Sequence, residues 1–255
     1  LKIYPNNNSL DKNRLLNEFN AYNYFRNKKI LLTPKSIAHF DFNNSAIYTW
    51  IDGKKITNLE IKLLKNIISF VRKLKILSNE TSFDTFSYAK EASINNMEII
   101  YQIEDRIKKL SILSKKEKKY KKLNTFLNND LKNFFKLTKI KYKKNNNKIQ
   151  KLNKKFYFLS PSDFSLQNMI INNNKVHYID FEYFGWDDPV KFTADFMLHP
   201  SNNLSQKFKK IWYDSMKLIF KNDNDFEYRF AQQYKLFAIK WVLIMLNDFV
   251  PLNLE

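Results

Sequence analysis

The sequence predicts an α+β fold, because strand patterns and helix patterns occupy separate stretches of the chain. Short alternating apolar runs typical of strands occur in residues 1–53, around one helix pattern, and again in 156–181. Apolar residues at helical spacing fill 57–140 and 189–249. With 255 residues, the chain is long enough to bury the core of one large domain or of two lobes that share a cleft.

The first fifty residues predict a strand, a helix and a hairpin. Residues 1–5 alternate as in a strand, and residues 10–25 place their apolar side chains on one side of a helix. Residues 36–42 and 46–51 flank the Asn pair at 43–44. Because asparagine tolerates the positive φ that tight turns need, these two stretches are expected to pair as a hairpin.

The middle of the chain is expected to be helical. Thr57 and Glu60 have the spacing of a capping box ahead of an apolar-periodic run, so a helix is expected to begin there. Further helices are expected over 90–113 and 115–138. Residues 139–155 have little periodicity and are expected to form a solvated loop.

Short strands and then helices are expected in the last hundred residues. The strands are expected at 156–159, 169–172 and 176–181, the last two joined by an Asn-rich turn. The helices are expected at 189–199, 203–221 and 225–249.

The chain contains only two glycines, Gly53 and Gly185. Gly53 follows the predicted hairpin, where a sharp exit from a sheet favours a residue without a Cβ atom. Gly185 lies in the stretch FEYFGWDDP, and in so Gly-poor a chain it predicts a backbone conformation that other residues do not tolerate.

Composition restricts the class of protein. Because the chain has no cysteine, it has no disulfide framework and no cysteine-ligated metal site, which fits a reducing cytoplasm. The longest apolar run, residues 236–246, is interrupted by Lys240 and is too short to cross a bilayer. We therefore expect a cytoplasmic protein without a membrane span.

The formal net charge of +19 is expected to attract nucleic acid or anionic membranes electrostatically. Residues 115–155 contain sixteen lysines against Glu117 and Asp130, so a basic nucleic-acid-binding protein is one alternative. This stretch lacks a recognisable stacking platform or groove-reading motif. We therefore expect a solvated, lysine-rich surface and no specific nucleic-acid partner.

The charge pattern is inverted in residues 156–200, which contain six acidic residues and only two lysines. Within this region Asp163 precedes Asn168 by five residues, and Asp180 follows the predicted hairpin. In phosphoryl transfer, a loop aspartate accepts the proton of the attacking hydroxyl while an asparagine and a second aspartate hold magnesium. The alternative readings are a turn-forming Asp163, an Asn168 without a special role and a strand-end Asp180.

Residues 159–189, LSPSDFSLQNMIINNNKVHYIDFEYFGWDDP, resemble the aminoglycoside phosphotransferase and choline kinase-like family. The resemblance implies a two-lobed protein-kinase-like fold, with a partial β-rich N-lobe at 1–53 and a mainly helical C-lobe at 54–255. It also implies ATP-dependent transfer of the γ-phosphoryl group to the hydroxyl of a small-molecule acceptor.

The same resemblance assigns roles to residues of this chain. Asp163 would be the catalytic base, and Asn168 and Asp180 would hold Mg²⁺, with Glu182 as a candidate auxiliary ligand. Asp188 and Asp195 would brace the cleft and start the next helix.

The resemblance also assigns the nucleotide-binding residues. Lys2 resembles the strand lysine that pairs with the α- and β-phosphates of ATP, and Glu18 resembles its partner on the following helix. Tyr48, Trp50 and Ile51 would lie in the hinge strand, whose backbone hydrogen-bonds adenine.

The chain departs from the family pattern at two places. The usual His-Gly-Asp of the catalytic loop reads Pro161-Ser162-Asp163, so the loop-supporting histidine is missing. Lys2 stands at the very start, without the two strands and the phosphate-covering loop that precede it in the family, which implies an N-terminally truncated member. Both departures motivate an alternative function, a catalytically weak kinase-like binding protein.

The sequence leaves the acceptor and the oligomeric state open. A cationic amino-alcohol or an aminoglycoside would suit an acidic, aromatic cleft in which Tyr183, Trp186 and Trp241 offer cation–π contacts. A sugar would suit such a cleft as well.

Overall fold

The computed structural model of the chain describes residues 1–5, 14–115, 118–146, 148 and 150–249. It confirms a mixed helix and strand architecture. The chain divides into two compact units, one formed by 1–92 with 157–220 and the other by 93–156 with 221–255. The lobe boundary expected after residue 53 stays a prediction.

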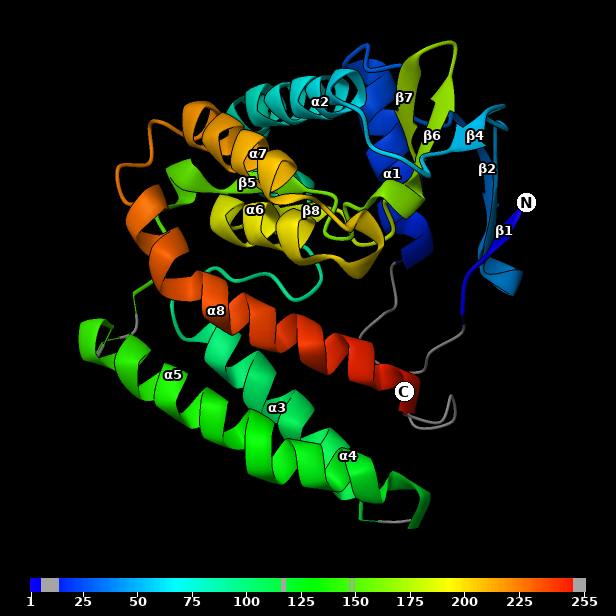
Figure 1. The fold of residues 1–255 in the computed structure, drawn as a ribbon. Coiled ribbons are helices and arrows are strands. Elements are labelled where there is room, and N and C mark those ends of the chain that lie inside the picture. The colour runs from blue at the N-terminus through cyan, green and yellow to red at the C-terminus, as the bar shows by residue number, and fades with distance from the viewer. Residues whose placement is uncertain (6–13, 116–117, 147, 149, 250–255) are drawn as a thin grey trace. The chain divides into compact units, whose positions relative to one another are not determined.

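The first unit contains three small antiparallel sheets, in the orders β1-β3-β2, β4-β6-β7 and β5-β8 (Figure 1). Their strands are β1 (Lys2–Ile3), β2 (Ser36–Phe40), β3 (Ser45–Tyr48), β4 (Lys54–Lys55), β5 (Phe158–Ser160), β6 (Met169–Asn172), β7 (Lys175–Tyr178) and β8 (Gly185–Asp187). The helices of this unit are α1 (Arg14–Asn27), α2 (Ile61–Glu80), α6 (Pro189–Leu198) and α7 (Gln206–Ile219).

Helix α1 packs on one face of the β1-β3-β2 sheet. Side chains alternate between the faces of a strand, so Lys2 and Tyr4 point to one side and Ile3 to the other. Tyr4, Leu15 and Ala46 form a buried cluster between helix and sheet, whereas Ile3 is 69% exposed. The expected hairpin is confirmed, with Asn44 in the left-handed region at φ 49°. Residues 10–13 of the expected first helix lie outside the described residues.

Glycine is required at positions 53 and 185 for different structural reasons. Gly53 has φ +145°, and a Cβ atom there would lie 2.3 Å from the backbone oxygen of Ile171, so the expectation of a special conformation is confirmed. Gly185 is explained by close packing, because its Cβ atom would lie 2.4 Å from the Ser87 oxygen. The special backbone conformation expected at Gly185 is therefore wrong. Glycine is needed there because two backbone segments approach each other closely.

Helix α2 supports the strands on both sides of the predicted catalytic loop. Its Phe70 ring stacks on Tyr178 of β7 with centroids 3.8 Å apart, and the Ser78 hydroxyl accepts a hydrogen bond from Leu159 N of β5. The helix begins at Ile61, after an extended Glu60 that makes no side-chain cap hydrogen bond. The predicted capping box is therefore wrong, and α2 begins later than that box implied.

Strand β8 leads directly into α6 through the Asp187-Asp188-Pro189 sequence. The Asp188 carboxylate accepts a hydrogen bond from Val190 N at 2.8 Å, and Pro189 occupies the first helical turn, where its missing N–H costs nothing. The expectation that Asp188 starts a helix is thus confirmed.

A buried lysine lies at the junction of β8 and α6. The Lys191 ammonium lies 2.9 Å from carboxylate oxygens of both Asp187 and Asp195, and its side chain is 3% exposed. Although burial alone would lower the pKa of Lys191, the two carboxylates raise it above its ordinary value. Lys191 is therefore charged, and it neutralises two acids in the interior.

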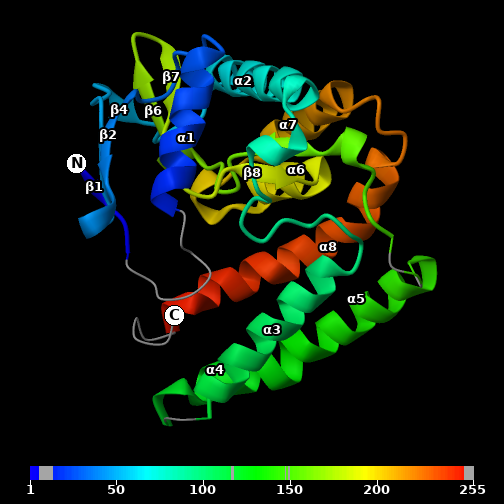
Figure 2. The ribbon, with the colours of Figure 1, turned by 180° about the vertical axis from the view of Figure 1, so that it is seen from behind.

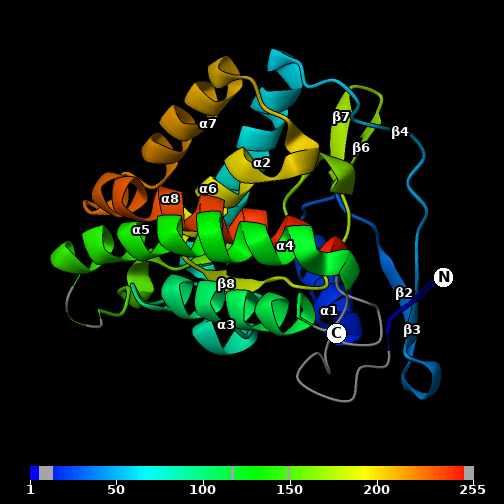
Figure 3. The same cartoon turned by 60° about the horizontal axis from the view of Figure 1, so that its bottom comes forward.

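The second unit is helical, with α3 (Glu98–Leu113), α4 (Lys121–Thr125), α5 (Lys132–Asn145) and α8 (Phe226–Met245) as its α-helices (Figures 2 and 3). A π-helical segment, Phe126–Leu131, joins α4 to α5. Lys240 of α8 donates a hydrogen bond to Gln102 of α3 at 2.8 Å. None of the helices in the described part of the chain is long and apolar enough to cross a membrane.

Two expected boundaries in the second unit are wrong. The helix predicted from residue 90 begins at Glu98, after a segment in which Asn95 caps it with hydrogen bonds to Met97 N and Glu98 N. Residues 139–145, expected as loop, continue α5, because Tyr142 is buried and donates to the Asn96 oxygen at 2.7 Å. Tertiary packing thus outweighs weak periodicity in this stretch.

Candidate active site

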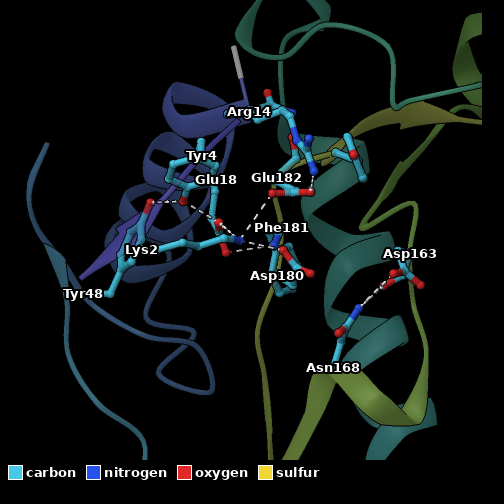
Figure 4. Close-up of polar contacts among 12 residues, drawn as sticks. Lys2, Tyr4, Arg14, Glu18, Tyr48, Asp163, Asn168, Asp180, Phe181 and Glu182 are labelled. Atoms are coloured by element: carbon cyan, nitrogen blue, oxygen red, sulfur yellow. Dashed lines mark hydrogen bonds and ion pairs between the residues drawn. The ribbon is translucent and has the colours of Figure 1, made fainter. Parts of the chain in front are cut away.

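Lys2 lies at the centre of an acidic cluster in the first unit (Figure 4). Its ammonium lies 2.6 Å from Glu18 Oε2, 2.7 Å from Asp180 Oδ1 and 3.4 Å from Glu182 Oε2. Burial opposes the charged form, but Glu18 and Asp180 outweigh it and raise the pKa of Lys2 above its ordinary value. The structure therefore brings together three residues that the sequence singled out, Lys2, Glu18 and Asp180.

Glu18 is held in place by donors from three directions. Besides Lys2, its carboxylate accepts hydrogen bonds from the hydroxyls of Tyr4 at 2.5 Å and Tyr22 at 2.6 Å, and from Phe181 N at 3.2 Å. The Glu18 side chain is only 2% exposed. A buried carboxylate is stable only when its oxygens are satisfied, so this arrangement fixes Glu18 as the anchor of Lys2.

Asp180 has a strained backbone, with φ +67°. Aspartate enters this left-handed region more readily than most residues, at a modest cost in free energy. Tyr22 stabilises this conformation by accepting a hydrogen bond from Asp180 N at 2.9 Å. Burial raises the pKa of the Asp180 carboxyl, Lys2 opposes the shift, and the nearby Glu18 and Glu182 add to it.

The acidic residues of this cluster fit a divalent cation. Carboxylate oxygens of Glu18, Asp180 and Glu182 lie within 4.8 Å of one another, and hard oxygen ligands are those that Mg²⁺ prefers. Glu18 is already engaged by its donors, and Arg14 pairs with Glu182. Asp180 is the most exposed of the three carboxylates, with 36% of its side chain exposed, and is therefore the one best placed to bind an ion.

Asp163 and Asn168 form a second pair, on the loop after β5 (Figure 4). The Asn168 side-chain nitrogen donates to Asp163 Oδ2 at 3.1 Å and to the Asp163 backbone oxygen at 3.2 Å. Both hydrogen bonds use the amide nitrogen, so the amide oxygen is the atom that could ligate a metal. The backbone oxygen of Asn168 accepts a hydrogen bond from Ile179 N at 3.0 Å, and this bond connects the loop to the segment that carries Asp180.

The Asp163 carboxyl is held in its ionised form. Burial alone would raise its pKa, but the adjacent His199 imidazole, together with the Asn168 side chain and the nearby Ser165, holds the pKa below its ordinary value. The side chain is 35% exposed, so an incoming hydroxyl can reach it. A proton-accepting role is therefore chemically available at neutral pH.

The loop backbone explains one departure from the family motif. Ser162 has φ +66°, the region that glycine adopts without strain, and it stands where the motif has its glycine. Its nitrogen donates to Ser160 Oγ at 3.0 Å and its hydroxyl donates to Lys90 O at 3.2 Å. These bonds hold a conformation that costs a side-chain-bearing residue roughly 1–2 kcal/mol.

We predict that Ser162→Gly leaves the free energy of unfolding within about 1 kcal/mol of the parent, because relief of strain offsets the greater chain entropy of glycine. Ser162→Val should be clearly less stable, because a β-branched residue resists positive φ. Both variants lose the hydroxyl, so chemical denaturation of the pair isolates the backbone effect. Equal stability of the two variants would contradict the left-handed assignment.

The residues predicted to form the hinge lie at the end of β3 and directly after it. Tyr48 is in β3, and its hydroxyl lies 2.7 Å from that of Tyr4, next to the Glu18 anchor. Trp50 and Ile51 follow in irregular backbone, and the Trp50 side chain is 86% exposed. Their hydrogen bonding to adenine stays a prediction.

The three aromatic residues expected to offer cation–π contacts to a cationic acceptor have different surroundings: one is buried, one faces two cations of the chain and one lies in the second unit. Trp186 is 2% exposed, and its indole nitrogen donates to Phe83 O at 3.2 Å, so it belongs to the core. The Tyr183 ring already faces Lys90 at 4.3 Å and Arg14 at 5.0 Å. Trp241 lies in α8, in the second unit. Cation–π recognition by Trp186 is therefore excluded by its burial.

Sequence reasoning missed the supporting residues Tyr4, Tyr22 and Arg14. Two of them had a detectable signal, because Tyr4 is two residues from Lys2 on a strand and Tyr22 is four residues from Glu18 on a helix. Each spacing puts the tyrosine on the same face as its partner. Arg14 reaches Glu182 only through the tertiary fold.

Comparison with solved structures gives similar folds at low sequence identity. The ethanolamine kinase of Plasmodium vivax has a TM-score of 0.62 and 16% identity, over 98% of this chain and 70% of that one. The choline kinase of Cryptosporidium parvum has a TM-score of 0.59 and 15% identity, over 97% and 76%. The gentamicin complex of APH(2″)-IIa has a TM-score of 0.54 and 19% identity, over 92% and 80%.

No protein-family model matches the chain, and a comparison with curated proteins finds no match. The structural likeness nevertheless extends over nearly the whole chain and includes both kinds of kinase that the motif at 159–189 resembles. This chain therefore has the protein-kinase-like fold that is shared by choline and ethanolamine kinases and aminoglycoside phosphotransferases.

Proposed function

We propose that this protein is an ATP-dependent phosphotransferase that moves the γ-phosphoryl group to a hydroxyl of a small molecule. The observation that carries the proposal is the placement of the Lys2 ammonium at 2.6 Å from Glu18 and 2.7 Å from Asp180, in the unit that also holds Asp163 and Asn168. The fold supports it, since the similar structures include an ethanolamine kinase and a choline kinase.

Each side chain has a role in this proposal. Lys2, oriented by Glu18, would bind the phosphates of ATP, and Asp163 would accept the proton of the acceptor hydroxyl. Asp180 and the amide oxygen of Asn168 would hold Mg²⁺, with Glu182 nearby as a further oxygen donor. The bound ion supplies charge neutralisation of the phosphate oxygens. The chain supplies position and a fixed electrostatic environment.

We propose an amino-alcohol, an aminoglycoside or a sugar as the acceptor. The similar structures include kinases of ethanolamine and choline and a complex with gentamicin, all of which offer hydroxyl groups. The acidic cluster around Asp180 is accounted for by Lys2 and metal, so it does not by itself favour a cationic acceptor. We also propose a cytoplasmic location, which the cysteine-free composition supports.

The metal assignment gives a direct experiment. We predict that Asp180→Ala and Asn168→Ala each weaken binding of ATP in the presence of Mg²⁺, measured by calorimetric titration, because each removes a hard oxygen ligand. Binding without Mg²⁺ should change much less. Parent-like affinity and Mg²⁺ dependence in both variants would remove the metal site from the proposal.

A matched control is Asp214→Ala, which removes an aspartate from an exposed i,i+4 pair with Lys210 on α7. It should bind ATP with Mg²⁺ as the parent does. If this control loses affinity as much as Asp180→Ala, the effect reflects total charge and not a metal ligand.

A further inference from the structure

The turn that follows α6 contacts the loop of Asp163 at two points. His199 ends α6, and a 3₁₀ turn, Pro200–Asn202, comes next. His199 Nε2 lies 3.3 Å from Asp163 Oδ1, and Asn202 Oδ1 accepts a hydrogen bond from Leu166 N at 2.8 Å. Both ends of the loop segment 163–166 are therefore held by the same turn.

The surroundings of His199 determine which ring nitrogen carries the proton. Ser201 N lies 3.2 Å from His199 Nδ1, and a backbone N–H can only donate, so Nδ1 must accept. In the neutral imidazole the proton is then on Nε2, the atom that faces Asp163. His199 in this neutral form thus presents its Nε2–H to the carboxylate of Asp163.

The two oxygens of Asp163 have different partners. Oδ2 accepts from Asn168 at 3.1 Å, whereas Oδ1 is buried without a hydrogen bond of normal geometry. The His199 N–H, at 3.3 Å, is placed to supply that bond after a small rotation. Hydrogen bonds of catalytic groups are often long before substrate binds and shorten in the complex.

Asn202 anchors the turn from the other side. Its side chain is 5% exposed and links two backbone segments, since its nitrogen donates to Phe196 O of α6 at 2.8 Å while its oxygen accepts from Leu166 N. The turn is therefore fixed to the helix that begins at Asp188. His199 in turn makes its contact with Asp163 from a rigid base.

We infer that His199 is a positioning residue for Asp163 and takes over the supporting role of the histidine that the loop motif Pro161-Ser162-Asp163 lacks. The inference rests on the proposed function, because positioning matters only if Asp163 accepts a proton. Asn168 and His199 together fix both carboxylate oxygens from different elements. Because Oδ1 is buried while the side chain as a whole is 35% exposed, Oδ2 is the oxygen that the acceptor hydroxyl can reach.

The experiment compares His199→Leu with His199→Gln. Loss of an orienting partner should lower kcat about 10- to 100-fold in the leucine variant, with the KM for ATP little changed, because His199 is not among the proposed nucleotide or metal ligands. Glutamine, which offers an N–H at a similar reach, should restore most of kcat. A leucine variant with parental kcat, or equal losses in both variants, would overturn the inference.

His39→Leu is the matched control, since His39 Nδ1 pairs with Asp41 at 3.1 Å on the exposed hairpin. This imidazole–carboxylate pair lies outside the loop, so its loss should leave kcat unchanged. A decrease in kcat equal to that of His199→Leu would show that general destabilisation, and not positioning, explains the effect.

A second readout does not depend on turnover. The chain has three histidines, so ¹⁵N NMR of the imidazoles is readily assigned. We expect His199 in the Nε2–H form, with its Nε2 resonance shifted by Asp163→Asn while His39 and His177 keep theirs. An Nδ1–H form, or no shift, would refute the contact. Absence of phosphoryl transfer in the parent would instead overturn the proposed function, and this spectrum would still decide the contact.

Discussion

Asp163→Asn is expected to lower kcat for phosphoryl transfer by roughly 10²- to 10⁴-fold, the usual contribution of a positioned general base. The substitution keeps the shape of the side chain and removes its capacity to accept the proton. Asn168 approaches the carboxylate at 3.1 Å, and that neighbour remains in place. Steady-state kinetics of the variant and the parent, with the same acceptor, measure the effect.

The affinity for ATP with Mg²⁺ should survive this substitution, because Asp163 is not among the proposed nucleotide or metal ligands. Asp214→Asn, on the exposed face of α7, is the control for loss of one negative charge. A variant with near-parental turnover would show that Asp163 is not the base and that another group accepts the proton.

Lys191→Met is expected to lower the free energy of unfolding by about 3–5 kcal/mol, because it removes the cation that neutralises Asp187 and Asp195 in the interior. The Asp187 side chain is fully buried and that of Asp195 is 11% exposed. Methionine fills a similar volume, so the change tests charge and not packing. Chemical denaturation at neutral pH measures the loss.

The same variant should have a distinctive pH dependence. Without the lysine, the buried carboxyls bind protons in the folded state at pH values where the unfolded chain has released them, so stability should fall as the pH rises through that range. In the parent, the raised pKa of Lys191 keeps its contribution intact at neutral pH.

Lys210→Met is the matched control for Lys191→Met. Lys210 and Asp214 have the same i,i+4 spacing as Lys191 and Asp195, and a similar nitrogen–oxygen distance of 2.8 Å, but their side chains are 78% and 49% exposed. Exposed pairs of this kind contribute about 0.5 kcal/mol or less. A similar loss in both variants would mean that burial does not determine the effect.

The part of the site that is local in sequence could be predicted. Asp163, Asn168 and Asp180 lie in one short stretch of the sequence. Their spacing, across a loop, a hairpin and a strand end, can be recognised without knowledge of the fold. Lys2 and Glu18 were indicated by their resemblance to the family's strand lysine and its helix partner, in a stretch that reads as a strand followed by a helix. The N-cap at Asp188 was likewise a local signal.

The rest of the site depends on contacts that only the fold creates. His199 reaches Asp163 from the far end of α6, and Arg14 reaches Glu182 from α1. Glycine is required at position 185 because the backbone around Ser87 packs directly against it. The residues next to Gly185 in the sequence give no sign of this contact. From the sequence alone, the absence of the loop histidine suggested a weakened site. In our proposal His199, which comes from the end of α6, supports Asp163 in its place.

Conversion of ATP to a phosphorylated acceptor tests the account most directly. We would incubate the protein with ATP, Mg²⁺ and separate acceptors of the amino-alcohol, aminoglycoside and sugar classes, and follow the γ-phosphate by ³¹P NMR. We predict a new phosphomonoester resonance with one class of acceptor, with ADP formed in equal amount, and loss of this resonance in Asp163→Asn. A folded protein that binds ATP but yields no phosphomonoester with any class would contradict it and would favour a binding protein on a kinase-like fold.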